Sequence, residues 1–221
     1  MPTIRGNIKT HKKGNPMRPI TNRSAPNRLA KKLAALLSSA LNSIIGCLLS
    51  NTTDTMAKLQ NVGMRCKKLV SFDVKPLFTN VPIDAAKRTL TEIDEDELPL
   101  PRDNFIHPPL RGTWPLEFRG RKYEQIQGLA MGSPLSVVLA QLFMQTLEAD
   151  HYRNIMGLRY VDDILTILPT RTNLQDLLHR LNAVYPSIQF IAEDERNEQL
   201  PFLDIVIHKR PDGPVFSVKT H

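Results

Sequence analysis

Residues 158–168 read LRYVDDILTIL, two short apolar runs that meet at the adjacent acids Asp162 and Asp163. Both runs are rich in residues that favour strands, so the segment predicts a β-hairpin with the acids where its two strands meet. A carboxylate buried among apolar residues is costly unless a cation or hydrogen bonds compensate. We therefore expect a positive group near the pair. An Asp-Asp pair that only forms an Asx-type turn is the alternative.

A third carboxylate, Asp73, ends another strand-like run, LVSFD at residues 69–73. If the two segments pair side by side, Asp73 lies next to Asp162. A set of carboxylates without Cys or His offers only oxygen ligands, which favours Mg²⁺ or Mn²⁺ and phosphoryl transfer through substrate phosphates. Taken alone, without the hairpin, Asp73 is more consistent with a capping or turn residue.

Charge is distributed unevenly along the chain, which has a net charge of +7. Residues 1–72 hold 13 basic and 1 acidic residue (+12), and the remaining residues hold 16 basic and 21 acidic (−5), which together give +7. A basic front before an acidic body predicts a lobe that binds a polyanion, attached to a part that needs carboxylates. A merely solvated lysine-rich surface is the alternative.

Length and composition indicate a folded protein. With 221 residues and 41% apolar content, the chain suits one domain or two subdomains. Cys47 and Cys66 lack metal-binding spacing, so we expect no zinc and a reducing compartment. We see no secretory signal, and polar residues interrupt the longest apolar stretch, 33–49. We expect a soluble, intracellular protein.

Periodicity gives the expected elements. Residues 1–28 suggest extended segments and loops. Helices are predicted over 28–49, 84–93 (with Asp84 as a cap), 135–151 and 173–185. SIQFIAE at 187–193 suggests a strand, and hairpins are expected around 116–126 and in the tail, with its turn at 211–213. This order predicts an α+β fold, a largely antiparallel sheet with helices on one face.

Five segments in order resemble the motifs of reverse transcriptases, most closely those of Penelope-like retroelements: RPI at 18–20, SFDVKPLFTNVP at 71–82, QGLAMGSPLS at 127–136, RYVDDIL at 159–165 and LPFLDI at 200–205. The resemblance implies a right-hand polymerase. Residues 1–70 would be a basic fingers segment, and 71–221 the palm, with a fingers insertion near 94–126 and a primer-grip hairpin near 200–219. Because the chain stops just after that hairpin, we expect the thumb to be absent.

The resemblance also implies roles for individual residues. Asp73, Asp162 and Asp163 would be the catalytic acids that bind two Mg²⁺ ions, or Mn²⁺ in their place, with the backbone carbonyl of Val74 completing one shell. The nucleotide would be bound by Arg18, Phe78, Gln127, Gly128 and Gly132. Primer and template would lie along Tyr160, Val161, Lys9, Lys12, Phe202 and Leu203. Phe78 would crowd the sugar 2′ position and so favour deoxynucleotides, although it also suits a buried turn.

Two functions remain open on the sequence. The first is an RNA-directed DNA polymerase core of a retroelement, acting on a primed RNA or DNA template with dNTPs and without a membrane partner. The second is an inactive nucleic-acid-binding fragment of such an enzyme. A primer-independent RNA polymerase is disfavoured by Phe78. Since an element that copies into chromosomes must meet DNA, the nucleus is the expected location.

Overall fold

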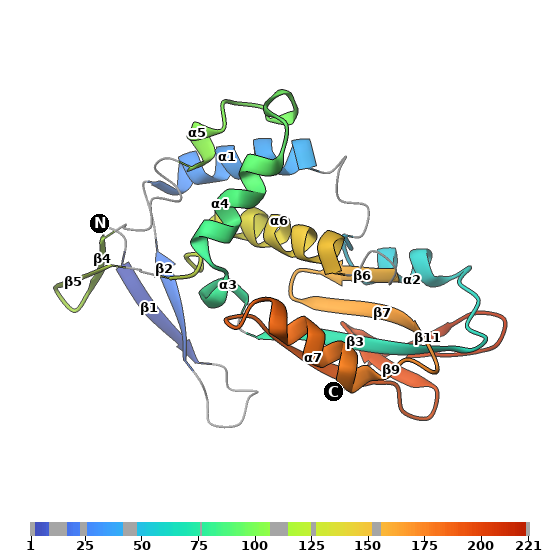
Figure 1. The fold of residues 1–221 in the computed structure, drawn as a ribbon. Helices are drawn as coiled ribbons and strands as arrows, with labels where there is room; N and C mark the ends of the chain where they lie inside the picture. The colour runs from blue at the N-terminus through green and yellow to red at the C-terminus, as the bar shows by residue number, and fades with distance from the viewer. Residues whose placement is uncertain are drawn as a thin grey trace. The chain divides into compact units, whose positions relative to one another are not determined.

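The computed structural model describes residues 3–8, 17–22, 26–41, 48–75, 77–106, 115–124, 127–151 and 156–219 (Figure 1). The chain divides into two compact units, and each is assembled from two separate segments. Unit 1 comprises Met1–Ile44 and Leu77–Thr146, and unit 2 comprises Ile45–Pro76 and Leu147–His221.

Unit 2 is built on a four-stranded antiparallel sheet. Its strands lie in the order β6 (Met156–Tyr160), β7 (Asp163–Pro169), β3 (Lys67–Lys75) and β8 (Gln189–Asp194). Residues 164–168 of β7 are all buried, as expected for a strand covered on both faces. The sheet confirms the predicted α+β class and three of the predicted strand segments.

Two helices of unit 2 are α2 (Thr52–Leu59) and α7 (Leu174–Val184). Asn173 begins α7 because its side chain accepts hydrogen bonds from the first-turn N–H groups. Farther along α7, the Asn182 amide exchanges two hydrogen bonds with the backbone of Phe190 in β8, at 2.7 and 3.2 Å. The predicted helix over 173–185 is therefore confirmed, and Asn182 ties it to the sheet.

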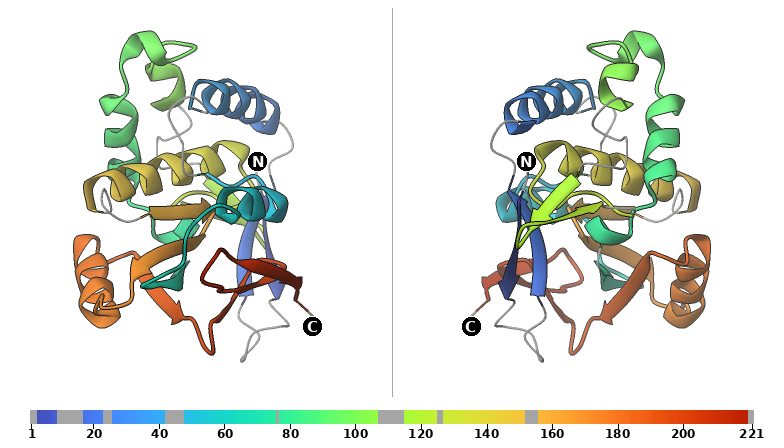
Figure 2. Two further views of the ribbon diagram at one scale, coloured as in Figure 1. Left: turned by 90° about the vertical axis from the view of Figure 1, so that its right-hand side faces the viewer. Right: turned by 90° about the vertical axis from the view of Figure 1, so that its left-hand side faces the viewer.

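A second sheet of unit 2 has the order β11 (Val215–Val218), β10 (Ile205–His208), β9 (Gln199–Phe202), coloured towards red in Figure 2. The tail thus contains two turns, not the single expected turn at 211–213. The additional turn forms because Leu203 adopts a φ of 51° and lets β9 pair with β10. Glu195 joins the sheets: its carboxylate accepts the Leu69 N–H at 2.9 Å and pairs with the Lys209 ammonium.

Unit 1 contains a four-stranded sheet in the order β2 (Met17–Asn22), β1 (Thr3–Ile8), β4 (Pro115–Phe118), β5 (Arg121–Glu124). Its helices are α1 (Pro26–Leu41), α3 (Leu77–Asn80), α4 (Ile83–Glu92), the 3₁₀ turn Glu95–Glu97 and α5 (Asp103–Ile106). Helix α6 (Pro134–His151) begins in unit 1 and ends in unit 2. The hairpin predicted around 116–126 and the helix predicted over 135–151 are confirmed.

Two helix predictions need correction. Of the helix expected over 28–49, the structure describes α1 up to Leu41, and residues 42–47 lie outside the described residues. Leu49 is not helical and packs in the core of unit 2 with Leu158. Asp84 is not the cap of α4: Pro82 precedes the helix, and Asp84 lies in its first turn, 3.6 Å from the Lys87 ammonium.

Among the described residues, no helix is both long enough and apolar enough to cross a membrane.

Candidate active site

A strained two-residue turn joins β6 to β7. Tyr160 pairs with Asp163, so Val161 and Asp162 form the turn. Val161 has a φ of 56°, whereas Asp162 is not in the left-handed region, which is the φ pattern of a type II′ turn. A β-branched residue rarely adopts a positive φ, and the cost is about 1–2 kcal/mol. The structure therefore holds the Asp-Asp segment in a conformation that Val161 does not favour by itself.

The register of β3 brings the acids together. Asp73 lies directly opposite Asp163, and the Val74 N–H donates a hydrogen bond to the Asp162 carbonyl at 3.1 Å. Directly opposed residues of neighbouring strands project their side chains to the same face. Asp73 and Asp163 therefore share one face at the end of the sheet. The sequence predicted Asp162 next to Asp73. In the structure Asp163 lies opposite Asp73, and Asp162 is hydrogen-bonded through its carbonyl to Val74, the residue after Asp73.

The acids are not buried, contrary to the expectation for an apolar hairpin. Asp162 and Asp163 are half-buried, and the Asp73 side chain, two residues before the end of β3, is 40% exposed. The Lys75 ammonium lies 3.5 Å from Asp73 Oδ2. Lys75 thus places a positive charge beside Asp73, whereas the sequence predicted one beside the Asp162–Asp163 pair.

The donor atoms suit a hard cation. Within the described ranges, no group of three or more His, Cys, Asp or Glu side chains is arranged as a metal cage. Asp73 and Asp163 nevertheless present carboxylates to one face. Val74 and Asp162, which follow and precede them in sequence and share a backbone hydrogen bond, add a carbonyl oxygen and a further carboxylate to the nearby oxygen atoms. An all-oxygen set of this kind fits Mg²⁺ or Mn²⁺, which commonly retain waters and substrate phosphates as further ligands.

An ion pair behind the hairpin was not predicted. The Arg159 side chain is 1% exposed, and its Nε donates to Glu148 Oε1 at 2.6 Å. The Arg159 carbonyl accepts the Leu49 N–H at 2.7 Å. Burial raises the pKa of Glu148, and the Arg159 charge opposes that rise. The signal in the sequence was an arginine within an apolar strand, which required an acidic partner but did not identify one.

In unit 1, the glycine-rich loop 127–133 packs directly against α3. Leu129 N–H donates to the Phe78 carbonyl at 2.6 Å. Gly128 has a φ of 74°, and a Cβ there would lie 2.3 Å from the Thr79 carbonyl oxygen. Phe78 is half-buried, whereas Leu77 takes the core position at 2% exposure. Glycine is therefore required at 128 because the loop approaches the backbone that carries Phe78.

The other predicted residues have varied surroundings. Tyr160 is 37% exposed, while Phe202 is 3% exposed within the core of unit 2. Gln127 is exposed, and Gly132 has a φ of 99°. Arg18 lies in β2, but its side chain falls outside the described residues, as do Lys9 and Lys12 entirely. The roles assigned to these residues remain predictions.

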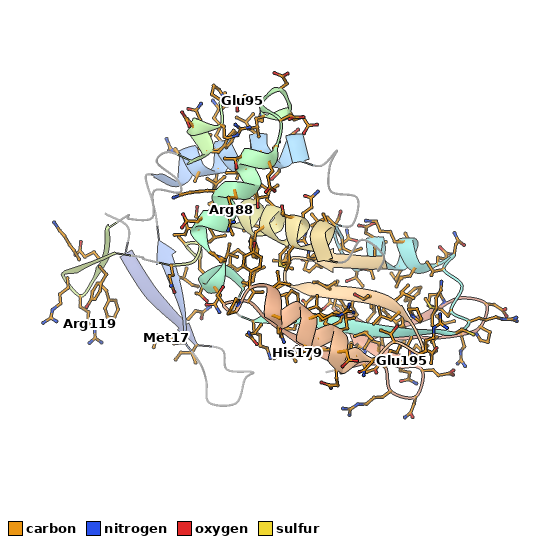
Figure 3. All side chains as sticks on the ribbon, in the orientation of Figure 1. Met17, Arg88, Glu95, Arg119, His179 and Glu195 are labelled. Carbon is orange, nitrogen blue, oxygen red and sulfur yellow. The ribbon has the colours of Figure 1, made fainter. Side chains whose placement is uncertain are left out.

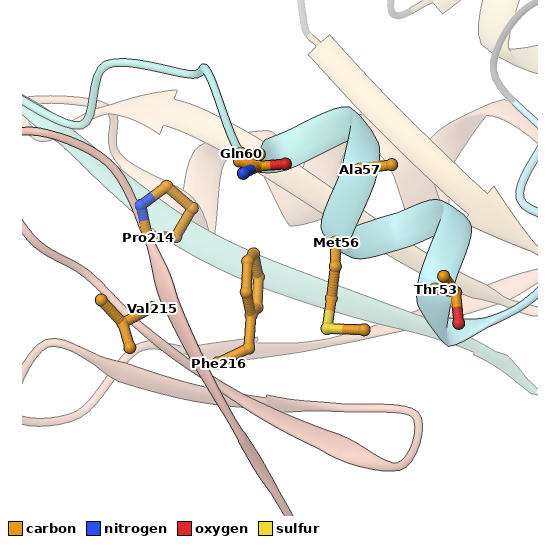
Figure 4. Close-up of a pocket in the computed structure, with 7 residues that line it drawn as sticks. All are labelled: Thr53, Met56, Ala57, Gln60, Pro214, Val215 and Phe216. Carbon is orange, nitrogen blue, oxygen red and sulfur yellow. The ribbon is translucent and has the colours of Figure 1, made fainter.

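A pocket of about 450 Å³ lies elsewhere in unit 2, between α2 and β11 (Figure 4). It is lined by Thr53, Met56, Ala57, Gln60, Pro214, Val215 and Phe216. Because the lining offers no acid or base, this pocket is not the candidate active site.

Solved polymerase structures share the fold. The apo telomerase of Candida tropicalis truncated from its C-terminal domain matches with a TM-score of 0.67 at 12% identity, over 99% of this chain and 55% of that chain. The telomerase of Candida albicans in complex with a TWJ fragment of telomeric RNA matches with a TM-score of 0.63 at 12% identity, over 96% of this chain and 46% of that chain. The BmCPV RNA-dependent RNA polymerase at elongation state matches with a TM-score of 0.62 at 11% identity, over 93% of this chain and 21% of that chain.

These matches show a fold like the palm and fingers of polymerases, and the chain spans about half the length of the telomerase chains. A search of curated proteins found no match. The sequence profile described as reverse transcriptase (RNA-dependent DNA polymerase) matches residues 10–195, most of the chain. The protein therefore belongs to the reverse transcriptase family.

Proposed function

We propose that the chain is the core of a retroelement reverse transcriptase, most similar to those of Penelope-like elements. It would transfer a nucleotide from a dNTP to a primer 3′-hydroxyl on an RNA or DNA template. The observation that supports this proposal is the opposed pair Asp73 and Asp163 at the end of the hairpin, in a chain of this family.

In this proposal, the carboxylates of Asp73, Asp162 and Asp163 and the carbonyl of Val74 hold two Mg²⁺ ions. When bound, the ions supply activation of the attacking hydroxyl and stabilisation of the leaving pyrophosphate. The strained turn and the β3 register fix the acids at the end of the sheet. Such preorganisation supports catalysis because the ligands need not reorganise during the reaction.

The remaining assignments concern substrates. Arg18, Lys9 and Lys12 would contact phosphates, and Phe78 would exclude a 2′-hydroxyl. Support for Phe78 comes from its half-buried position beside the loop that carries Gln127, Gly128 and Gly132. Tyr160 and Val161, with Phe202 and Leu203, would lie along the primer. Residues 1–70 would form fingers, 71–221 the palm, and the nucleus would be the site of action.

Primer extension on an RNA template tests the catalytic assignment. We expect Asp73→Asn, and the double variant Asp162→Asn, Asp163→Asn, to lower the extension rate with dNTPs about a hundredfold or more. Asp204→Asn is the matched control, because Asp204 also follows a positive-φ residue in a two-residue turn, that of β9 and β10. Full extension by the Asp73 and Asp162/Asp163 variants would refute the proposal.

The second candidate is a nucleic-acid-binding fragment that cannot extend a primer. It is favoured by the Lys75 ammonium, which lies 3.5 Å from Asp73 Oδ2 and competes with a metal ion for that carboxylate. Salt-sensitive binding of template-primer without extension by the wild-type chain would support it. Extension abolished by Asp73→Asn would exclude it.

A further inference from the structure

The β4–β5 hairpin of unit 1 is closed by a tight two-residue turn. Its strands are joined by Arg119 and Gly120, whose φ values of 51° and 73° match a type I′ turn. Figure 3 shows Arg119 at the tip of this hairpin. β5 is also the edge strand of its sheet. The hairpin therefore presents side chains on a backbone with a fixed twist.

The register sorts these side chains onto two different faces. Phe118 lies opposite Arg121, and Tyr123 is two residues farther along the same strand, so the three share one face. Phe118 is 41% exposed and Tyr123 46% exposed. The Arg119 guanidinium lies over the Phe118 ring, 5.4 Å from its centroid. Glu117 and Lys122 oppose each other on the reverse face.

We propose that the face formed by Phe118, Arg119, Arg121 and Tyr123, the aromatic-basic face, binds single-stranded nucleic acid. Exposed aromatic rings offer stacking surfaces for bases, and the two guanidinium groups offer charge to phosphates. Within the described strands of the hairpin, Glu117 lies on the reverse face and not on this one. This assignment rests on the proposed polymerase function, and it makes the aromatic-basic face a contact for a template strand that is not base-paired.

A duplex suits this face less well, because its bases are already stacked on one another. If the hairpin served only to keep the surface soluble, charged side chains would be enough. Exposed aromatic rings on the same face as the cations would then have no use. Stacking on an aromatic side chain typically changes affinity about tenfold or more per base. The aromatic-basic face therefore predicts that loss of a ring weakens binding of a single strand and spares binding of a duplex.

The test measures binding of a fluorescent single-stranded RNA 20-mer and of a blunt RNA duplex to the full chain by anisotropy. We expect Tyr123→Ala to weaken single-strand binding about tenfold with an unchanged salt slope. Arg121→Ala should lower the affinity and also reduce the salt slope by about 0.7. Tyr123→Phe, which keeps the ring, should bind like the wild type.

Lys122→Ala is the matched control, because Lys122 is the next residue on the same strand with the same charge but faces the other way. It should weaken binding less than Arg121→Ala. Equal losses for Arg121→Ala and Lys122→Ala, equal losses on duplex and single strand, or no loss in Tyr123→Ala would each overturn the proposal. Circular dichroism checks that the variants fold.

Failure of this inference is distinguishable from failure of the polymerase proposal. Asp73→Asn is expected to lose extension but to bind the single-stranded RNA like the wild type, because Asp73 is not part of the aromatic-basic face. Normal binding by every hairpin variant, with extension still dependent on Asp73, would refute only the role of the hairpin.

Discussion

Arg159 Nε donates a hydrogen bond to Glu148 Oε1 at 2.6 Å, and the arginine is almost completely buried. Arg159 directly precedes Tyr160 in β6, so the ion pair anchors the strand that carries the Val161–Asp162 turn. Removing one member of a buried pair leaves the other charge without compensation, whereas replacing both with apolar residues is often tolerated. The pair is therefore expected to act on the hairpin as a unit.

Arg159→Leu should lower the free energy of unfolding by about 2 kcal/mol, because the Glu148 side chain, which is 20% exposed, then stays mostly out of water without its cation. The double variant Arg159→Leu, Glu148→Leu should recover most of that loss. Urea denaturation of the wild type, both single variants and the double variant measures the coupling. Additive losses in the double variant would show that the two residues act independently.

The pair also predicts a pH dependence. Burial raises the pKa of Glu148 above its ordinary value of 4.5, so the folded protein binds a proton more tightly at this group than the unfolded chain. The stability contributed by the protonated Glu148 is complete below about pH 4.5 and is lost as the pH rises through the folded pKa. Wild-type stability relative to Glu148→Gln should therefore fall over that window, measured by urea denaturation at each pH. A flat difference would contradict the raised pKa.

Gly128→Ala should destabilise the protein by about 2 kcal/mol or more, because it adds a clash with the Thr79 carbonyl to the strain of a positive φ. Gly120→Ala is the control: Gly120 has nearly the same φ, 73°, and a Cβ added there would have no neighbouring atom within 4 Å. It should cost only about 1 kcal/mol. Thermal unfolding compares the two, and equal losses would indicate that the loop does not need its close approach to α3.

Val161→Gly should be more stable than Val161→Ala by about 1 kcal/mol. Both variants remove the valine methyl groups, but only glycine relieves the strain of the φ of 56°. Chemical denaturation measures the difference between the two variants. If alanine is equally stable, the turn is not strained at this residue.

Lys75→Gln should tighten Mn²⁺ binding about fivefold, because it removes a positive charge 3.5 Å from Asp73. Its effect on unfolding should stay within about 0.5 kcal/mol, since the Lys75 and Asp73 side chains are 45% and 40% exposed and water screens their charges. Calorimetric titration with Mn²⁺ measures the affinity. Lys68→Gln is the control, because Lys68 lies in the same strand but pairs with Asp194; an equal gain there would mean that net charge alone is responsible.

The sequence predicted those parts of the structure that depend on local patterns. The β6–β7 hairpin, the turn at Arg119 and Gly120 and the helix after Asn173 were all identifiable, because turn residues and apolar periodicity act over a few positions. The gathering of Asp73 with the Asp-Asp segment was also predicted, from the types of residue that end the two strands.

What the sequence could not supply depends on contacts between distant segments. Asp163 rather than Asp162 opposes Asp73, because the register of β3 on β7 is set by the whole sheet. The apolar pattern that ran past Leu41 did not reveal that Leu49 belongs to another core. Likewise, the glycine-rich loop was visible, but the reason for Gly128 is the Thr79 carbonyl.

The central position of β3 in its sheet affects folding during synthesis. Both neighbours of β3, the strands β7 and β8, are encoded from Asp163 onward. At usual translation speeds, β3 waits on the order of ten seconds for either partner. During that interval an apolar strand containing Leu69, Val70 and Phe72 has two open edges, which invite pairing with other nascent chains. During synthesis β3 therefore stays open to pairing with another chain until β7 or β8 has left the ribosome.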